Sequence, residues 1–281
     1  MPTYGSTTQT SIRLRKAPVL TDYQISSIER ELREFDMFDL WLQPDLGNVQ
    51  QLGRSLQVMD RTGSWIAEAT DAGIVIGSAF TGPLPTIDIP ADAASSANEM
   101  PLHVPGYFLP NSYTVIIVGE MRSFPIAQPA QFFNAGVAGG GDVEAYLVNN
   151  AVAMRHGDLQ SQTTGSQFTT SGSNYNAQKF CAWFSYDADL ADGAYGKNSA
   201  VATSWNPAVD ALGPNLSGEQ RPLVIGGKFN PAGSAGEQLM GIKLHSVFAS
   251  RESWIKPGDT ALRTRFLDLI RQRHGADITW S

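Results

Sequence analysis

The side chains that most often carry out chemistry in proteins are few and scattered along this sequence. His103, His156, His245 and His274 lie far apart, and none forms the H-x-x-x-H or H-E-x-x-H spacing that binds a metal from one helix face. Segment 187–193 loosely matches a calcium loop, but Ala191 and Asn198 stand where the loop needs an oxygen ligand and an acid. A solvated turn is therefore favoured over a calcium site, and we expect no metal or other cofactor.

Carboxylates are the next candidates, because glycoside hydrolysis needs two of them across a sugar. The nearest approach to an E-x-D-x-x-E strand motif is segment 34–39, which ends in Asp39 and falls at the end of a predicted helix. Helical spacing does not aim these groups into one groove. Glu120 precedes Arg122 by two residues, which favours a structural ion pair at a strand end. We therefore expect no catalytic residues and a non-enzymatic protein.

Aromatic side chains next to amides or carboxylates could bind glycans instead, since a ring can contact the apolar face of a sugar while the polar groups bond its hydroxyls. Such residues occur at strand ends and in loops. The candidates are Trp205, Asn206, Tyr175, Asn176, Tyr186, Asp187 and Tyr195. The competing interpretation, that these aromatics complete the core or fill a subunit interface, is the favoured one.

Charge and cysteine content exclude several classes of protein. The 281 residues carry a formal net charge of -7, and between residues 62 and 178 the basic residues are Arg122 and Arg155 alone. A surface that neutralises a phosphate backbone needs a concentrated basic patch, so nucleic-acid binding is disfavoured. The single cysteine, Cys181, excludes an internal disulfide framework and lies in an apolar run, which predicts a buried, inert thiol.

The N-terminal residues lack the basic start and apolar run of a signal peptide, and no apolar stretch approaches the ~20 residues of a membrane span. We expect a product made in a cytoplasm and without a membrane span, which acts outside a cell only if it leaves within a particle or through lysis.

Periodicity divides the chain into four parts: a flexible arm at 1–20, a helical attachment segment at 21–55, a β-sandwich at 56–258, and a C-terminal helix and tail at 259–281 packed on the sandwich. Thr21 and Gln24 fit a capping box for the first helix, and Asp259 fits the N-cap of the second, which Gly275 ends.

Segment 113–118 is apolar on both faces, as in a central strand between two layers. We expect strands at 65–69, 73–77, 86–89, 113–122, 131–137, 143–148, 152–156, 179–186, 200–205, 223–229 and 239–250.

The segments 221–229 and 237–248 carry a resemblance to the concanavalin A-like superfamily, particularly its laminin G-like and pentraxin-like jelly rolls. Members typically show L-x-I-G-G and then F/L-x-G-x-I before the last long strand, and this chain has Leu223-Val224-Ile225-Gly226-Gly227 and Leu239-Met240-Gly241-Ile242. The resemblance covers about residues 56–255 and implies a mostly β fold, an antiparallel sandwich of two sheets flanked by the N-terminal segment and the C-terminal helix. The superfamily's calcium and sugar ligands do not map onto this sequence.

A lone sandwich with a Ser/Thr-rich arm and no secretion signal looks like a phage virion protein, such as a head decoration, spike or tail-fibre subunit. By this analogy the protein is structural and forms a homo-oligomer on the capsid or tail, and its sandwich faces outward, where it can contact host surface polysaccharide. Attachment to the particle would use a basic patch and a helix face, formed by Arg13, Arg15, Lys16, Ile25, Ile28, Leu32, Phe35 and Trp41. The alternatives are a lectin module as the main role and, less favoured, a polysaccharide-cleaving glycanase of the same fold.

Overall fold

A computed structural model describes residues 26–45, 47–70, 73–77, 85–91, 100–122, 130–137, 142–148, 151–157, 159–162, 168, 170–172, 174–205, 220–229, 236–237, 240–275 and 277–280. The predicted arm with Arg13, Arg15 and Lys16 lies outside these residues, as do Ile25 and Asn206. In the part of the chain that is described, no helix is long and apolar enough to cross a membrane.

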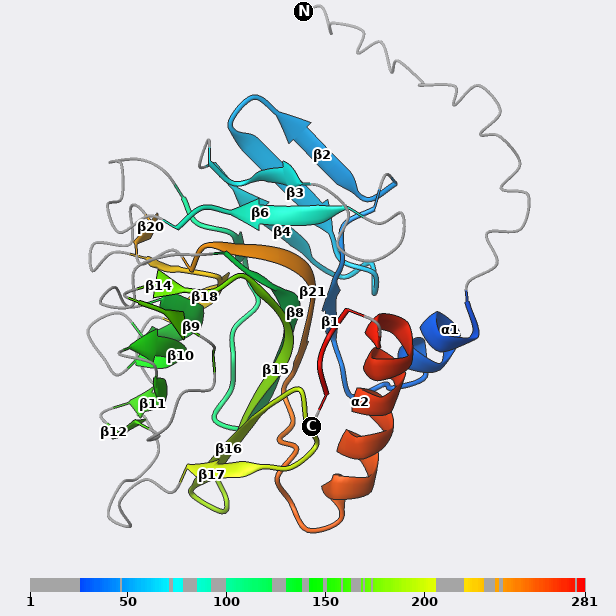
Figure 1. Ribbon diagram of the computed structural model, residues 1–281, viewed down its shortest axis with the longest axis vertical. Helices are drawn as coiled ribbons and strands as arrows, with labels where there is room; N and C mark the ends of the chain where they lie inside the picture. Colours follow the sequence, from blue (N-terminus) through cyan, green and yellow to red (C-terminus); the bar gives the residue numbers. More distant parts are fainter. Residues whose placement is uncertain are drawn as a thin grey trace, which may run out of the picture.

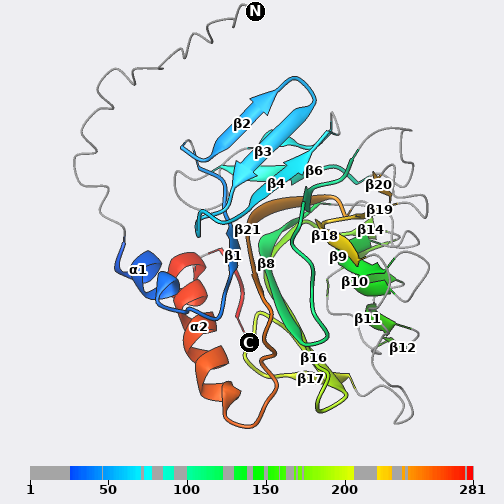
Figure 2. The same ribbon diagram turned by 180° about the vertical axis from the view of Figure 1, so that it is seen from behind.

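Two large antiparallel sheets make up most of the described chain (Figures 1 and 2). The eight-stranded sheet runs in the order β17 (Thr203–Trp205), β16 (Asp192–Lys197), β15 (Gln178–Asp187), β8 (Tyr113–Met121), β21 (Ile242–Ser250), β6 (Thr86–Ile89) and β5 (Val75–Gly77), with β1 (Leu40–Leu42) also paired to β21. The nine-stranded sheet runs in the order β12 (Leu159–Gln162), β11 (Ala151–Gly157), β10 (Asp142–Val148), β9 (Ala130–Val137), β18 (Gln220–Ile225), β7 (His103–Val104), β4 (Ile66–Ala69), β3 (Ser55–Met59) and β2 (Val49–Leu52). Two small hairpins complete the strands: β13 (Thr170–Ser171) with β14 (Asn174–Tyr175), and β19 (Lys228–Phe229) with β20 (Gly236–Glu237).

The main core lies between the two sheets. Val115 and Phe184 from the eight-stranded sheet and Val104 and Phe133 from the nine-stranded sheet belong to one buried apolar cluster. Strands alternate side chains between faces, so each sheet contributes every second residue to this cluster. The prediction of a mostly β, antiparallel sandwich of jelly-roll type with a C-terminal helix is therefore confirmed.

A second apolar cluster covers the opposite face of the eight-stranded sheet, where α1 (Ser27–Arg33) and α2 (Asp259–His274) pack (Figure 1). Phe266 of α2 is central to it. Its ring centroid lies 4.7 Å from that of Phe38, 5.0 Å from that of Phe248 and 5.3 Å from that of Trp254. The eight-stranded sheet is thus the middle layer of three.

The first helix and its continuation pack on their own chain. Leu32, Phe35 and Trp41 are buried in the second cluster, and Ile28 is half-buried against it. The expectation that these side chains attach the protein to a particle is therefore wrong for the three buried ones, because α2 and the eight-stranded sheet already cover them. Segment 21–55 is also not helical throughout, since β1 and β2 lie within it.

Helix boundaries differ from the predicted caps. The Ser26 hydroxyl accepts a hydrogen bond from the Glu29 amide (3.1 Å), so Ser26 and not Thr21 caps α1. Gly258, with a φ of 102°, precedes α2, and Asp259 is its first residue; the Asp259 carboxylate instead accepts from the Lys256 amide (3.0 Å). Gly275 ends α2, as predicted.

The C-terminal tail is held on the eight-stranded sheet beside Cys181. Asn198 accepts a hydrogen bond from the Cys181 amide (2.8 Å) and donates one to the Thr279 carbonyl (2.9 Å). Lys179 forms an ion pair with Asp277 (2.8 Å). The Cys181 thiol is buried as predicted, and this burial raises its pKa far above the ordinary value.

Burial lowers the pKa of three of the four buried histidines. The His245 and His274 rings contact each other edge to face at 4.5 Å under α2, near Arg273 and Arg61. Burial, the facing ring and these two arginines lower the pKa of His245, while burial and Arg273 lower that of His274 to about 3. His156 lies between the sheets, stacked on Tyr186 at 3.7 Å, and burial lowers its pKa to about 3.

Removing the Phe266 ring should destabilise the protein strongly. We expect Phe266→Ala to lower the free energy of unfolding by about 3–5 kcal/mol, because it leaves a cavity among packed aromatic rings. Urea unfolding followed by tryptophan fluorescence measures this. Leu262→Ala, at an exposed position of the same helix, is the control and should cost less than about 1 kcal/mol; equal losses would contradict the central role of Phe266.

Stability should fall steeply in mild acid. An unfolded histidine takes up a proton below about pH 6.5, whereas these folded histidines resist protonation until the pH is far lower. Below pH 6.5 each of these histidines therefore lowers the free energy of unfolding by up to ~1.4 kcal/mol per pH unit. Above about pH 7.5 it has no such effect. Urea unfolding at pH 8, 6 and 5 measures how the free energy of unfolding changes with pH. His156→Phe should reduce this slope by the contribution of one titrating group. An unchanged slope in that variant would rule out His156 as a contributor.

Candidate functional site

The two outward faces of the sandwich are chemically different. The helices cover the outer face of the eight-stranded sheet with apolar side chains, which leaves the outer face of the nine-stranded sheet as the place for polar groups. Most inward residues of that sheet are apolar, with His156 as an exception; Leu56, Val58, Ala67 and Ala69 are apolar examples. The residues between them point outward, because alternate side chains of a strand lie on opposite faces.

One outward residue from each of eight neighbouring strands forms a continuous row across this face. Residues paired directly across strands share a face, and the pairings follow one another without a break. In spatial order the row is Gln50, Gln57, Glu68, His103, Val224, Asn134, Glu144 and Arg155. Val224 is the single apolar member. We call this set the polar row.

The β9–β11 end of the polar row is a buried ionic network. Glu144 is only 2% exposed, and its carboxylate accepts a hydrogen bond from the Asn134 amide (3.1 Å) and lies 3.4 Å from the Arg155 guanidinium. A buried carboxylate persists only when it is paired and hydrogen-bonded, and here its own neighbours in the row do both. The side chains at this end of the row are therefore held in place by one another.

His103 joins the buried and open parts of the row. Its Nδ1 lies 2.8 Å from the Pro101 carbonyl oxygen, which can only accept, so Nδ1 carries the proton and donates. Its Nε2 is left facing the Glu68 carboxylate at 3.6 Å. The Glu68 side chain remains 39% exposed.

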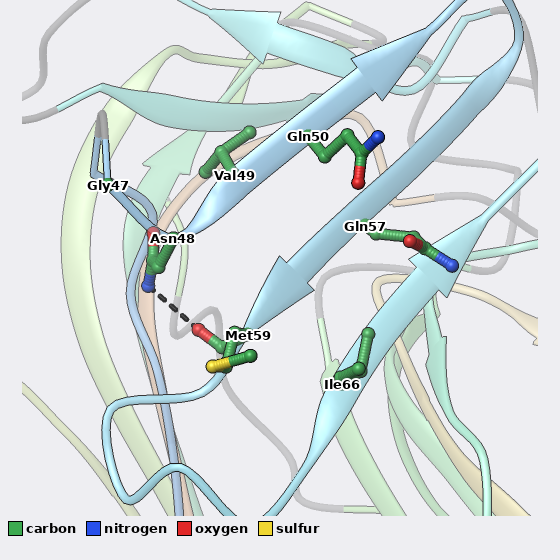
Figure 3. Close-up of a pocket in the computed structure, with 7 residues that line it drawn as sticks. All are labelled: Gly47, Asn48, Val49, Gln50, Gln57, Met59 and Ile66. Carbon is green, nitrogen blue, oxygen red and sulfur yellow. Dashed lines mark hydrogen bonds between the residues drawn. The ribbon is translucent and has the colours of Figure 1, made fainter. Parts of the chain in front are cut away.

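The β2–β4 end of the row opens into a shallow pocket of about 430 Å³ (Figure 3). It is lined by Gly47, Asn48, Val49, Gln50, Gln57, Met59 and Ile66. Asn48 is structural: its side-chain nitrogen donates to the Gln43 carbonyl (2.9 Å) and to the Met59 carbonyl (2.8 Å). Among the described residues, Gln50 and Gln57 make no side-chain hydrogen bonds, so both amides are available to a ligand.

Apolar side chains lie beside these amides. Met59 and Ile66 are cross-strand partners at the same face and are 49% and 45% exposed. Figure 3 shows them next to each other at one end of the pocket, with the two glutamines on the adjacent strands β2 and β3. The pocket therefore offers free amides and an aliphatic surface side by side, without a charged lining residue.

The residues predicted to bind glycans do not gather into a site. Tyr186 and Tyr195 are buried in the core between the sheets, which confirms the favoured interpretation for these two and removes them as glycan-binding candidates. Trp205 ends β17 and Tyr175 ends β14, and the backbone of these two residues is described without their side chains. Asn176 follows β14 and is half-buried.

Asp187, also predicted to bind glycans, is fully buried and has a structural role. The Ser253 hydroxyl donates to its Oδ2, and the amides of Asp189 (3.0 Å) and Leu190 (3.1 Å) donate to its Oδ1. Burial raises the pKa of this carboxyl, but the hydrogen bonds and Lys256 lower it by more, so that the pKa lies below its ordinary value. Its oxygens hold the turn before β16, which fits the predicted turn better than a calcium ligand. In the described chain no three His, Cys, Asp or Glu residues cluster to hold a metal.

Sequence reasoning missed the polar row because its members are spread over more than a hundred residues and are joined only by strand register. The available signal was weak: single polar residues interrupt apolar strands, as Glu144 does between Val143 and Ala145. Short strands such as β2 and β7 were also not predicted.

Comparison with known proteins does not assign the chain to a family. No family model matches it. No curated protein matches it either. Among solved structures, the carbohydrate-binding module CBM40 of Ruminococcus gnavus IT-sialidase is similar at 10% identity with a TM-score of 0.41, over 55% of this chain and 82% of the module. The same module bound to α2,6-sialyllactose has a TM-score of 0.40 at 10% identity, over 56% and 82%. Trypanosoma rangeli sialidase is similar at 11% identity with a TM-score of 0.46, over 83% of this chain and 32% of that one. Similarities of this size do not place the chain in either group.

Breaking the buried ionic network should cost stability in a way that a second substitution relieves. Arg155→Met leaves the Glu144 carboxylate without its cation, and we expect a loss of about 1–3 kcal/mol in the free energy of unfolding. Adding Glu144→Gln should recover part of this loss, with a coupling energy above about 0.5 kcal/mol in a double-mutant cycle. Arg271→Met, at an exposed position of α2, is the control. Strictly additive effects would show that the pair is not coupled.

Proposed function

We propose that this protein binds carbohydrate through the outer face of its nine-stranded sheet, with the β2–β4 pocket as the contact point. The observation that carries the proposal is the pair of free amides, Gln50 and Gln57, beside the exposed Met59 and Ile66. Each amide presents both donors and an acceptor, as sugar hydroxyls require, and the aliphatic groups can cover the apolar face of a pyranose ring.

Binding without cleavage is the better-supported form of this proposal. Hydrolysis by a carboxylate pair needs the two groups roughly 5–9.5 Å apart. The polar row contains two carboxylates, Glu68 and Glu144, which lie four strand spacings apart, or roughly 19 Å at ~4.8 Å per strand. These two residues are therefore too far apart to act on one glycosidic bond.

The role in a phage virion stays a prediction. Of the residues proposed for attachment, Leu32, Phe35 and Trp41 are engaged within the chain, so attachment would fall to the basic residues of the arm. Incorporation into particles after deletion of residues 1–20 tests that prediction, and is independent of carbohydrate binding.

The carbohydrate-binding proposal is tested by titration of the full chain with purified oligosaccharides and by a glycan array. We expect Gln57→Ala to weaken binding by about 2- to 10-fold, the value of one neutral hydrogen bond, and Gln50→Ala with Gln57→Ala to weaken it further. Gln272→Ala, which removes an exposed glutamine from α2, is the matched control and should bind as the unmodified protein does. Absence of binding to every glycan, or equal binding by Gln57→Ala, would refute the proposal for this pocket.

A further inference from the structure

The charges on and around the β2–β4 pocket bear on which class of sugar it can hold. The acidic sugars, sialic and uronic acids, carry a carboxylate that proteins hold with an arginine, a lysine or free backbone N–H groups. None of the residues that line the pocket is charged. The site must therefore obtain any such group from its rim.

The described cations in the two turns beside the lining residues are Arg54 and Arg61, and each already has a partner within the protein. Arg61 is the nearby cation that the fold fixes most firmly, and its guanidinium pairs with Asp45 at 2.8 Å and lies 3.9 Å from Glu29. It also packs over the Trp41 ring at 5.6 Å, and little of its side chain is exposed. Arg61 therefore links α1 to the β3–β4 turn through these ion pairs.

The backbone N–H groups at the pocket rim are occupied as well. The Gly47 amide donates to Asp45 Oδ1 at 2.7 Å, and the Asn48 amide donates to the same oxygen at 3.1 Å. Two successive N–H groups converging on one oxygen are the arrangement that would otherwise bind an external carboxylate. Here the internal carboxylate of Asp45 takes that place.

The charged residue that pairs directly with Gln57 across the strands is negative. Glu68 follows Gln57 directly in the polar row and keeps 39% of its side chain exposed. A carboxylate at this position accepts hydrogen bonds from neutral hydroxyls and repels an acidic sugar.

We infer that the pocket takes neutral oligosaccharides and discriminates against sialylated and uronic-acid glycans. This inference rests on the proposed function and names its ligand class. Gln50, Gln57 and Glu68 span two strand spacings, roughly 10 Å across the strands. The sugar chain therefore lies across β2–β4, and the site contacts more than one sugar ring.

The test is a calorimetric titration of the full chain with two sets of probes. The neutral set is the one-, three- and six-residue members of the malto-, cello-, xylo- and manno-oligosaccharide series. The acidic set is 3′- and 6′-sialyllactose and trigalacturonate. We expect at least one neutral series to bind, with affinity rising from one residue to three, and every acidic probe to bind at least about 10-fold more weakly, or about 1.4 kcal/mol.

Two variants tie the discrimination to the named charge. Glu68→Gln should narrow the gap between neutral and acidic probes by about 2- to 5-fold, because it removes the repulsion while keeping the side chain's shape. Glu252→Gln, which removes an exposed carboxylate outside the pocket, should leave the gap unchanged. If acidic probes bind as tightly as neutral ones, or more tightly, the inference is wrong, although the proposed carbohydrate binding is still supported. Failure of both probe sets to bind would instead overturn the proposed function itself.

Discussion

Burial of the eight-stranded sheet on both faces is the constraint on which the rest of the structure depends. In β8, Val115 and Ile117 belong to the core between the sheets, while Ile116 and Val118 belong to the cluster under the helices. A strand in this position is buried on both faces, so most of its residues are apolar, and buried polar residues such as Thr114 need hydrogen-bond partners. The middle layer therefore contributes stability and leaves little room for polar chemistry.

The opposite sheet has the complementary composition. Its inner face completes the core, and its outer face carries the polar row, from the exposed amide of Gln50 to the buried carboxylate of Glu144. Strand register links the two faces, because a shift of one residue in any strand would place its polar member in the core and an apolar residue outside. The packing that stabilises the sandwich thus also aligns the groups proposed to contact a ligand.

Local patterns predicted the fold better than the site. The long strands, the apolar central strand at 113–118 and the buried thiol of Cys181 all follow from hydrophobic periodicity, which depends only on neighbouring residues. Strand β16 was not among the predicted strands, yet it pairs with β15, and a Cβ at Gly196 would lie 2.4 Å from the Trp183 indole. The site could not be derived in this way: Gln57 and Glu68 become neighbours only through the pairing of β3 with β4. The aromatics chosen for glycan contact failed for a related reason, since strand alternation turns Tyr186 and Tyr195 inward.

The position of Cys181 has a consequence for the motions of the molecule. Its amide is bonded to Asn198, which in turn holds the Thr279 carbonyl of the C-terminal tail, and its thiol lies in the cluster under α2. A solvent-borne thiol reagent can reach this sulfur only when the tail and helix separate from the sheet. The rate of modification of the sole cysteine is therefore the intrinsic rate of the exposed thiol scaled by the opening equilibrium of the helical layer, so the protein contains its own reporter of local unfolding, on the face opposite the polar row.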